Sequence, residues 1–191
     1  MTSGKRIVLI GGGVRSGKSG FALSRAQMLG ARRAFVATAE ALDAEMKQRI
    51  AQHRRERGDD FQTVEEPIAL SEAISSLQDV DVVILDCLTL WLSNLLLREE
   101  SSQRILQRVD ELAVVLRRQA FHCIVVTNEV GMGVVPETRL GRAFRDLCGL
   151  AHQRIARCAD EVYVAILGSI LRIKPAPVEV QLVGESHANL E

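Results

Sequence analysis

Short apolar runs alternate with longer amphipathic segments along most of this chain. The apolar runs have the length and composition of strands that are buried on both faces, and the segments between them have helical spacing. The runs are Ile7–Ile10, Ala34–Ala37, Val80–Asp86, Cys123–Thr127 and Glu161–Leu167. This alternation predicts an α/β fold, with a mostly parallel sheet between helices and a ligand site at the carboxyl ends of the strands.

The last apolar run is followed by residues that can reverse the chain. Gly168 and Ser169 favour a turn, so residues 168–174 are expected to form a terminal antiparallel strand. From Pro175 onward the sequence is polar and contains proline, which predicts a loosely held end. Because no repeat, low-complexity block or linker interrupts the body, we predict one domain over residues 1–175 and a polar C-terminal tail over residues 176–191.

Composition disfavours several classes of partner. The 191 residues include 24 basic and 24 acidic ones, so the formal net charge is zero and no general attraction to nucleic acid or to an anionic membrane is expected. No apolar segment approaches the roughly 20 residues of a membrane span, and the first run is too short for a signal peptide. These features predict a soluble cytoplasmic protein without a nucleic-acid partner.

The four cysteines give no sign of a metal or disulfide framework. They show neither CxxC spacing nor clustering with the four histidines, and most of them fall within apolar patterns. We therefore expect free, buried thiols.

Residues 12–19, GGVRSGKS, match the pattern G-x-x-x-x-G-K-[ST] between a predicted strand and a predicted helix. Such glycines let backbone N–H groups converge on phosphate oxygens, and the helix N-terminus adds partial positive charge. Lys18 is expected to reach the β- and γ-phosphates, and Ser19 to bind magnesium. The loop thus predicts a site for a nucleoside triphosphate with Mg²⁺, formed by Gly12, Gly13, Val14, Arg15, Ser16, Gly17, Lys18 and Ser19.

A phosphate-binding loop of this kind needs an acid at the end of a neighbouring strand. Asp86 ends the apolar run VDVVILD and suits that position, so Ser19 and Asp86 are the predicted metal side chains. The alternative is that Asp86 only caps the helix predicted to follow it.

A second candidate lies in an amphipathic segment after the second run. Leu42, Met46 and Ile50 share one helical face with His53 at its margin, and the basic run that begins at Arg54 follows directly. His53 could simply end that face beside solvated arginines. It could also be a nucleophile toward phosphorus, with guanidinium groups screening an incoming phosphate. Spacing alone leaves both interpretations open.

A dense polar stretch follows the fourth run. The strand is predicted to end at Thr127, Asn128 and Glu129, on the same sheet edge as the phosphate-binding loop, and the glycines beyond permit a loop there. Arginines then recur every three residues on the next helix, at Arg139, Arg142 and Arg145. They form either a solvated face or a contact with an anionic substrate or a neighbouring subunit.

Four stretches together resemble one family. They are GGGVRSGKS, ATAEALDAEMKQRIAQHRRERGDDFQTVEEP, DCLTLWLSNLL and VTNEVGMGVVPETRLGRAFRDLCGLAHQRIARCADEVYVAILGSILRIK. The chain resembles the bifunctional adenosylcobinamide kinase / adenosylcobinamide-phosphate guanylyltransferases of cobalamin biosynthesis from about Ile7 to Lys174. The resemblance implies a RecA-like P-loop domain that phosphorylates adenosylcobinamide and then transfers GMP from GTP to that phosphate. It also implies a homotrimer.

The resemblance assigns roles to particular residues. It implies that His53 carries the guanylyl group. It further implies nucleotide contacts from Thr38, Ala39, Arg54, Arg55, Glu56, Arg57, Glu65 and Asp86. Two positions depart from the family pattern, since Val14 stands where a smaller alanine is expected and His152 where asparagine is expected.

The sequence therefore predicts a two-stage enzyme. In guanylyl transfer, His53 attacks the α-phosphorus of GTP, and the adenosylcobinamide phosphate then displaces it. The kinase stage, with ATP or GTP, needs a positioned hydroxyl, which Glu129 or Asp86 could orient. One alternative is a simple small-molecule P-loop kinase with a structural His53. The other is a RecA-like nucleic-acid ATPase, which zero net charge and the presence of one Trp and one Tyr disfavour.

Overall fold

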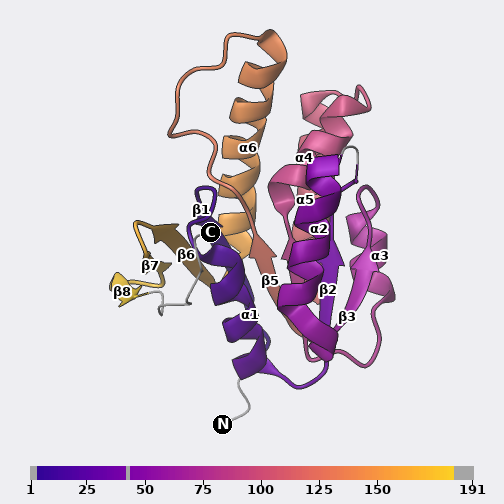
Figure 1. Cartoon of the computed structure of the whole chain (residues 1–191), viewed down its shortest axis with the longest axis vertical. Coiled ribbons are helices and arrows are strands. Elements are labelled where there is room, and N and C mark those ends of the chain that lie inside the picture. The colour runs from indigo at the N-terminus through magenta and orange to yellow at the C-terminus, as the bar shows by residue number, and fades with distance from the viewer. Residues whose placement is uncertain (1–3, 42–43, 183–191) are drawn as a thin grey trace.

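The computed structural model describes residues 4–41 and 44–182 of the chain. Its strands form one sheet in the order β3-β2-β4-β5-β1-β6-β7-β8, in which the first six are parallel and the last two antiparallel (Figure 1). The strands are β1 (Ile7–Gly12), β2 (Arg33–Ala37), β3 (Phe61–Glu65), β4 (Val82–Asp86), β5 (His122–Val126), β6 (Glu161–Ile166), β7 (Ser169–Lys174) and β8 (Glu179–Leu182). The predicted fold class is confirmed.

Helices cover both faces of the sheet. They are α1 (Lys18–Leu29), α2 (Ala44–Arg57), α3 (Leu70–Ser76), α4 (Leu88–Leu97), α5 (Ser102–Arg118) and α6 (Arg139–Cys158), with a short 3-10 turn at Gly58–Asp60. Among the described residues no helix is both long and apolar enough to cross a membrane.

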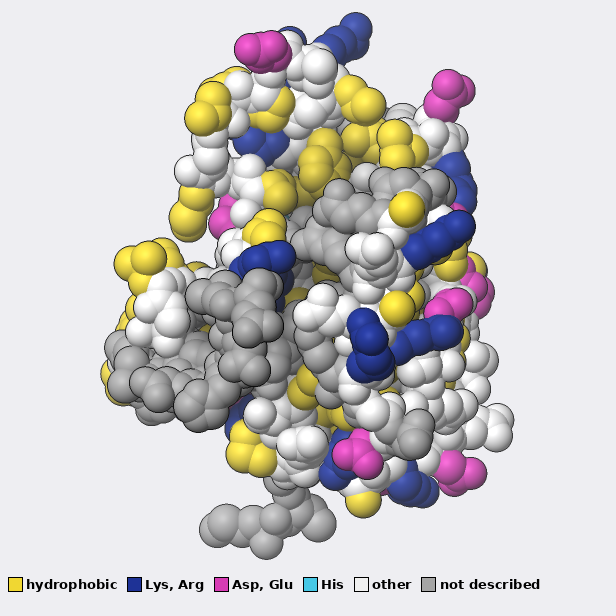
Figure 2. Space-filling model, in the orientation of Figure 1, with side chains coloured by type: hydrophobic (Ala, Val, Ile, Leu, Met, Phe, Trp, Pro, Cys, Tyr) yellow, Lys and Arg dark blue, Asp and Glu magenta, His cyan; other side chains and the backbone are white. Residues whose placement is uncertain are grey.

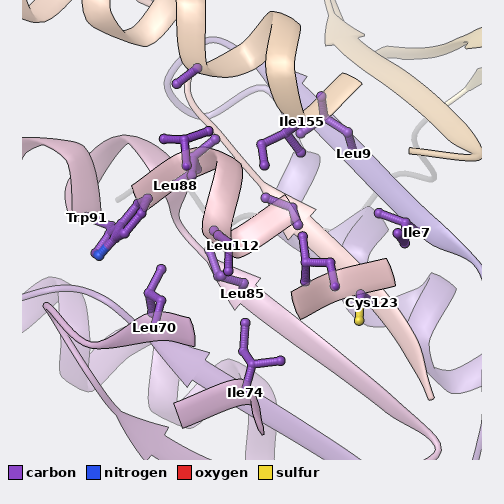
Figure 3. Packing of buried hydrophobic residues seen from close by; sticks show 14 of the residues in the cluster. Ile7, Leu9, Leu70, Ile74, Leu85, Leu88, Trp91, Leu112, Cys123 and Ile155 are labelled. Carbon is purple, nitrogen blue, oxygen red and sulfur yellow. The ribbon is translucent and has the colours of Figure 1, made fainter. Parts of the chain in front are cut away.

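Each central strand supplies side chains to two separate cores, because successive residues point to opposite faces. On β1, Ile7 and Leu9 pack beneath α3 to α6, whereas Val8 and Ile10 pack with α1. Figure 3 shows the larger core, in which Trp91 of α4 lies fully buried among leucine and isoleucine side chains. The indole of Trp91 donates to the Ile68 carbonyl at 2.8 Å, so its polar atom is satisfied.

The four cysteines are free and buried, as predicted. Burial raises the pKa of Cys87 to about 11 and that of Cys123 to about 12, so these thiols stay protonated near neutrality.

Two strands lie outside the predicted set. In β3 only Phe61 is buried, because among the described strands β3 stands at the edge of the sheet and pairs with β2. Its polar sequence, FQTVE, lacks the apolar run by which buried strands are found. The region predicted as a loose tail also contains structure, since Glu179–Leu182 forms β8 against β7. The predicted division into one domain and a tail otherwise stays a prediction.

Candidate active site

The strand register places the predicted site residues along one edge of the sheet. Neighbouring strands align Ile10 with Val126, Val126 with Asp86, Asp86 with Ala37, and Ala37 with Glu65. The row thus runs from the strand that enters the phosphate-binding loop, across the predicted metal acid, to Glu65. This is the carboxyl edge, where ligands bind in open parallel sheets.

Glycine is required where β1 enters the loop. Gly12 has φ +155°, and a Cβ atom there would lie 2.6 Å from the Ala165 carbonyl oxygen and 2.7 Å from Ser16 Oγ. Gly17 has φ 89° and stands as the N-cap of α1, so its own N–H and those after it face the loop at the start of the helix. The two glycines fix a tight turn that directs backbone donors into one concave space.

The interior of the phosphate-binding loop contains polar groups that could bind an anion. Lys18 is only 7% exposed, and its Nζ donates to the Gly13 carbonyl at 2.8 Å, which keeps the ammonium inside the loop. Ser16 Oγ is buried without a hydrogen-bond partner among the described residues. A phosphate oxygen would satisfy this hydroxyl and pair with the ammonium. Gly13, Val14 and Arg15 form the exposed outer side of the loop.

The two predicted metal side chains lie together. Ser19, in the first turn of α1, donates from Oγ to Asp86 Oδ2 at 3.3 Å. Hydroxyl and carboxylate oxygens are the ligands that Mg²⁺ prefers, and it commonly completes its shell with substrate phosphates and water. The pair therefore fits a magnesium ion at the mouth of the loop. Helix α4 begins after Cys87, which is its N-cap.

Thr38 has a structural role at the carboxyl edge of the sheet. Its Oγ1 donates to the Cys87 carbonyl and accepts from the Cys87 N–H, both at 2.8 Å, and the side chain is fully buried. Asn94 Nδ2 donates to the Thr38 carbonyl at 2.8 Å. These bonds join the ends of β2 and β4, and the nucleotide contact that the resemblance implies for Thr38 stays a prediction. Ala39 follows it and is half-buried.

Helix α2 contacts the row of aligned strand residues at its Glu65 end. Arg54 Nη2 donates to Glu65 Oε1 at 2.5 Å, which ties the start of the basic run to the carboxyl end of β3. Arg55 is exposed. His53 lies within α2, but its side chain and those of Glu56 and Arg57 are outside the described residues, as is Leu42, which the predicted face included.

A histidine stands behind the loop on the β5 side. The Glu129 N–H donates to the Gly12 carbonyl at 3.0 Å, which fixes the end of β5 against the phosphate-binding loop. His152 on α6 is hydrogen-bonded through Nε2 to Thr127 Oγ1 at 2.7 Å, and its Nδ1 lies 3.7 Å from Glu129 Oε2. Burial lowers the pKa of His152, with Glu129 opposing that change, so the ring is neutral near neutrality. From the sequence, His152 was noticed only as a departure from the family pattern. Its contact with Thr127 could not be predicted, because the two residues are 25 positions apart in the chain.

The arginines of α6 do not form a uniform basic face. Arg142 Nη1 donates to the carbonyls of Pro136 at 3.0 Å and Glu137 at 2.7 Å, so this side chain holds the preceding loop. Arg145 is half-buried, with Nε 4.0 Å from Asp146 Oδ1. Periodicity predicted the shared face but could not show that one member turns back onto its own loop.

The fold and this edge define a P-loop nucleoside triphosphate-binding protein. Solved structures agree on the fold: the RadB recombinase has a TM-score of 0.51 at 16% identity over 87% of this chain and 79% of that one. The flagellar accessory protein FlaH from Methanocaldococcus jannaschii gives 0.51 at 14% identity over 93% of this chain and 78% of that one. At such identities the likeness concerns architecture alone.

Sequence comparison is more specific. Residues 8–173 match the family model described as cobinamide kinase / cobinamide phosphate guanyltransferase. The chain is 40% identical over 171 residues to the bifunctional adenosylcobalamin biosynthesis protein CobP of Pseudomonas aeruginosa, covering 89% of this chain and 98% of the relative. It is 36% identical over 185 residues to CobU of Escherichia coli K12, covering 88% and 99%. The chain belongs to the cobinamide kinase / cobinamide phosphate guanyltransferase family, so it is a bifunctional enzyme of cobalamin biosynthesis.

Proposed function

We propose that the chain phosphorylates adenosylcobinamide with ATP or GTP and then transfers GMP from GTP to that phosphate, giving adenosylcobinamide-GDP. The observation that carries this proposal is the family match over residues 8–173 together with a complete phosphate-binding loop facing Asp86. Relatives that are covered almost from end to end are named as bifunctional proteins of adenosylcobalamin biosynthesis.

Both stages use the same phosphate-binding loop. Lys18 exchanges the Gly13 carbonyl for the β- and γ-phosphate oxygens, and the backbone N–H groups at the start of α1 bind the remaining charge. P-loop enzymes generally act on nucleotides that carry Mg²⁺, and here Ser19 and Asp86 would hold the ion, which neutralises phosphate charge when bound. In the kinase stage Glu129 or Asp86 orients the attacking hydroxyl, since Asp86 ends β4, Glu129 follows β5, and both lie beside the loop.

Guanylyl transfer proceeds through His53. An imidazole nitrogen forms a bond to the α-phosphorus of GTP, the bond from that phosphorus to the bridging oxygen breaks, and pyrophosphate leaves. A phosphate oxygen of adenosylcobinamide phosphate then bonds to the same phosphorus while the P–N bond breaks, which restores the imidazole. The Arg54–Glu65 contact supports this assignment, because it joins α2, directly after His53, to the row that contains Asp86.

Labelled GTP tests the covalent step. Incubation with α-phosphate-labelled GTP and magnesium, without corrinoid, should leave label on the denatured chain through an acid-labile, alkali-stable bond, and γ-labelled GTP should leave none. His53→Asn should lose the label and GMP transfer but keep phosphorylation of adenosylcobinamide. His122→Asn is the control and should label normally, because His122 begins β5 at the opposite sheet edge.

Two results would contradict the assignment. Label on the His53→Asn protein would place the covalent group elsewhere. A wild-type protein that phosphorylates adenosylcobinamide but never takes up label or transfers GMP would be a simple small-molecule kinase.

We also propose a homotrimer in the cytoplasm. The loop from Gly131 to Glu137 and the first turn of α6 expose Met132 (83%), Val134 (94%), Val135 (57%) and Leu140 (52%). In Figure 2 hydrophobic side chains gather over this upper part of the molecule. Apolar side chains concentrated in one loop support a contact between copies of the chain.

A further inference from the structure

A second charged cavity lies at the opposite edge of the sheet from the phosphate-binding loop. Its volume is about 460 Å³. It is lined by the residue that starts β1, by the ends of α5 and α6, and by β7, namely Lys5, Ile7, Arg117, Arg157, Cys158, Ala159, Asp160 and Lys174. The mechanism above uses none of these residues.

The two lysines are engaged with helix ends. Lys5 donates to the Arg117 carbonyl at the end of α5. Lys174 donates to the carbonyls of Ala156 at 3.0 Å and Ala159 at 2.5 Å at the end of α6. A helix C-terminus carries about half a negative charge, so the full positive charge of each ammonium is only partly neutralised by the helix end that it contacts.

The acid in the cavity is also engaged. Asp160 Oδ2 accepts the Ile7 N–H at 2.7 Å. Neighbouring Glu161 is paired outside the cavity, with Arg6 and Arg25 both at 2.6 Å. The guanidinium groups of Arg117 and Arg157 have no hydrogen bond or ion pair among the described residues. Four cations against one carboxylate and two helix ends leave a surplus of about two positive charges in this space.

We propose that this cavity binds a compact oligophosphate anion of the pyrophosphate type, at a site separate from the phosphate-binding loop. Two unengaged guanidiniums match such an anion, because their planar N–H groups bind phosphate oxygens in pairs. Ile7 and Gly12 are the first and last residues of β1, so the six-residue strand separates the two sites by about 17–20 Å. One nucleotide in the loop therefore cannot supply the phosphates for both.

Calorimetry on a Lys18→Ala background tests binding, because that change weakens anion binding at the phosphate-binding loop. Magnesium-free pyrophosphate should bind saturably, and Arg117→Gln with Arg157→Gln should weaken this binding by about tenfold or more. Arg118→Gln is the matched control. Arg118 is an exposed arginine at the end of the same helix that does not line the cavity, so its removal should change the affinity less than twofold. The same thermal unfolding midpoint in all variants will show that they are folded.

The thiol of Cys158 reports where the anion sits. Cys158 lines the cavity and is 7% exposed, whereas Cys87, Cys123 and Cys148 are at most 3% exposed. Pyrophosphate should slow the reaction of Cys158 with a neutral maleimide, and the double arginine substitution should abolish that protection. The same protection experiment with GTP distinguishes free pyrophosphate from the phosphate chain of a nucleotide. Protection by both anions means that the site recognises the phosphate chain and makes no use of the nucleoside.

Three results would overturn the proposal. They are absence of saturable binding, binding that the double substitution leaves unchanged, and equal protection by sulfate at matched ionic strength, which would indicate simple screening.

Discussion

At the scale of single residues, Asp86 and Ser19 carry the magnesium assignment. Asp86→Asn keeps the size of the side chain but removes the charge, so we expect the magnesium concentration for half-maximal turnover to rise about 10- to 100-fold. Magnesium titration of both activities measures this. The thermal unfolding midpoint should change little because the amide can still accept from Ser19 Oγ. An unchanged magnesium requirement would leave Asp86 a structural role at the start of α4.

His152 gives a pH prediction with a definite sign. Burial lowers its pKa below the ordinary value of 6.5, so on acidification the unfolded chain takes up a proton first. The free energy of unfolding should therefore fall as the pH drops below 6.5, with a slope of at most about 1.4 kcal/mol per pH unit from this one group.

Urea unfolding of wild type and His152→Asn between pH 5 and about 7.5 checks this, and the variant should show the shallower slope. The pKa of His122 is also lowered, but His122 is present in both proteins and its contribution cancels. Asparagine is the residue that the family resemblance implies at this position, so turnover near neutrality should be retained. Equal slopes would mean that His152 titrates alike in the folded and unfolded chains.

At the scale of elements, α6 contains two glycines in different surroundings. A Cβ at Gly141 would lie 2.7 Å from Cβ of Pro136, whereas one at Gly149 would meet no atom of the described residues within 4 Å. Alanine in an open helical position stabilises by about 0.5–1 kcal/mol, so Gly149→Ala should raise the free energy of unfolding. Gly141→Ala should lower it or leave it unimproved, because the rigid Pro136 ring must move.

Urea unfolding of the two variants measures the difference. Equal stabilisation by both would show that the loop before α6 moves away from the helix at little cost.

Elements differ in how far the sequence predicts them. Strands buried on both faces, such as β1 and β4, contain runs of four apolar residues and were located directly. The edge strand β3 was not, because only Phe61 is buried and the rest of its sequence suits solvent. The phosphate-binding loop was predicted residue by residue, because its backbone geometry requires glycine at Gly12 and Gly17. The contacts of Thr38 with Cys87 and of His152 with Thr127 were not, since they depend on how distant segments pack.

At the scale of the whole molecule, the proposed trimer places the exposed apolar side chains of the loop from Gly131 to Glu137 in a contact between subunits. Val134→Asp should convert the assembly to monomers, because an unpaired charge in a contact between chains costs several kcal/mol. Analytical ultracentrifugation measures the mass. Leu167→Asp is the matched control, since Leu167 is 96% exposed at the turn between β6 and β7, outside the loop. The same mass for wild type and Val134→Asp would contradict the proposed contact.

The strand order also determines when the nucleotide site can form during synthesis. β1 is the first strand to leave the ribosome, yet its partners are β5 (His122–Val126) and β6 (Glu161–Ile166). Until β5 emerges, the apolar segment Ile7–Ile10 has no native neighbour in the sheet, and pairings this distant along the chain form slowly. The motif that is easiest to recognise in the sequence is therefore among the last to take shape. Nascent chains that end before β5 contain every residue of the phosphate-binding loop but lack the sheet that positions it.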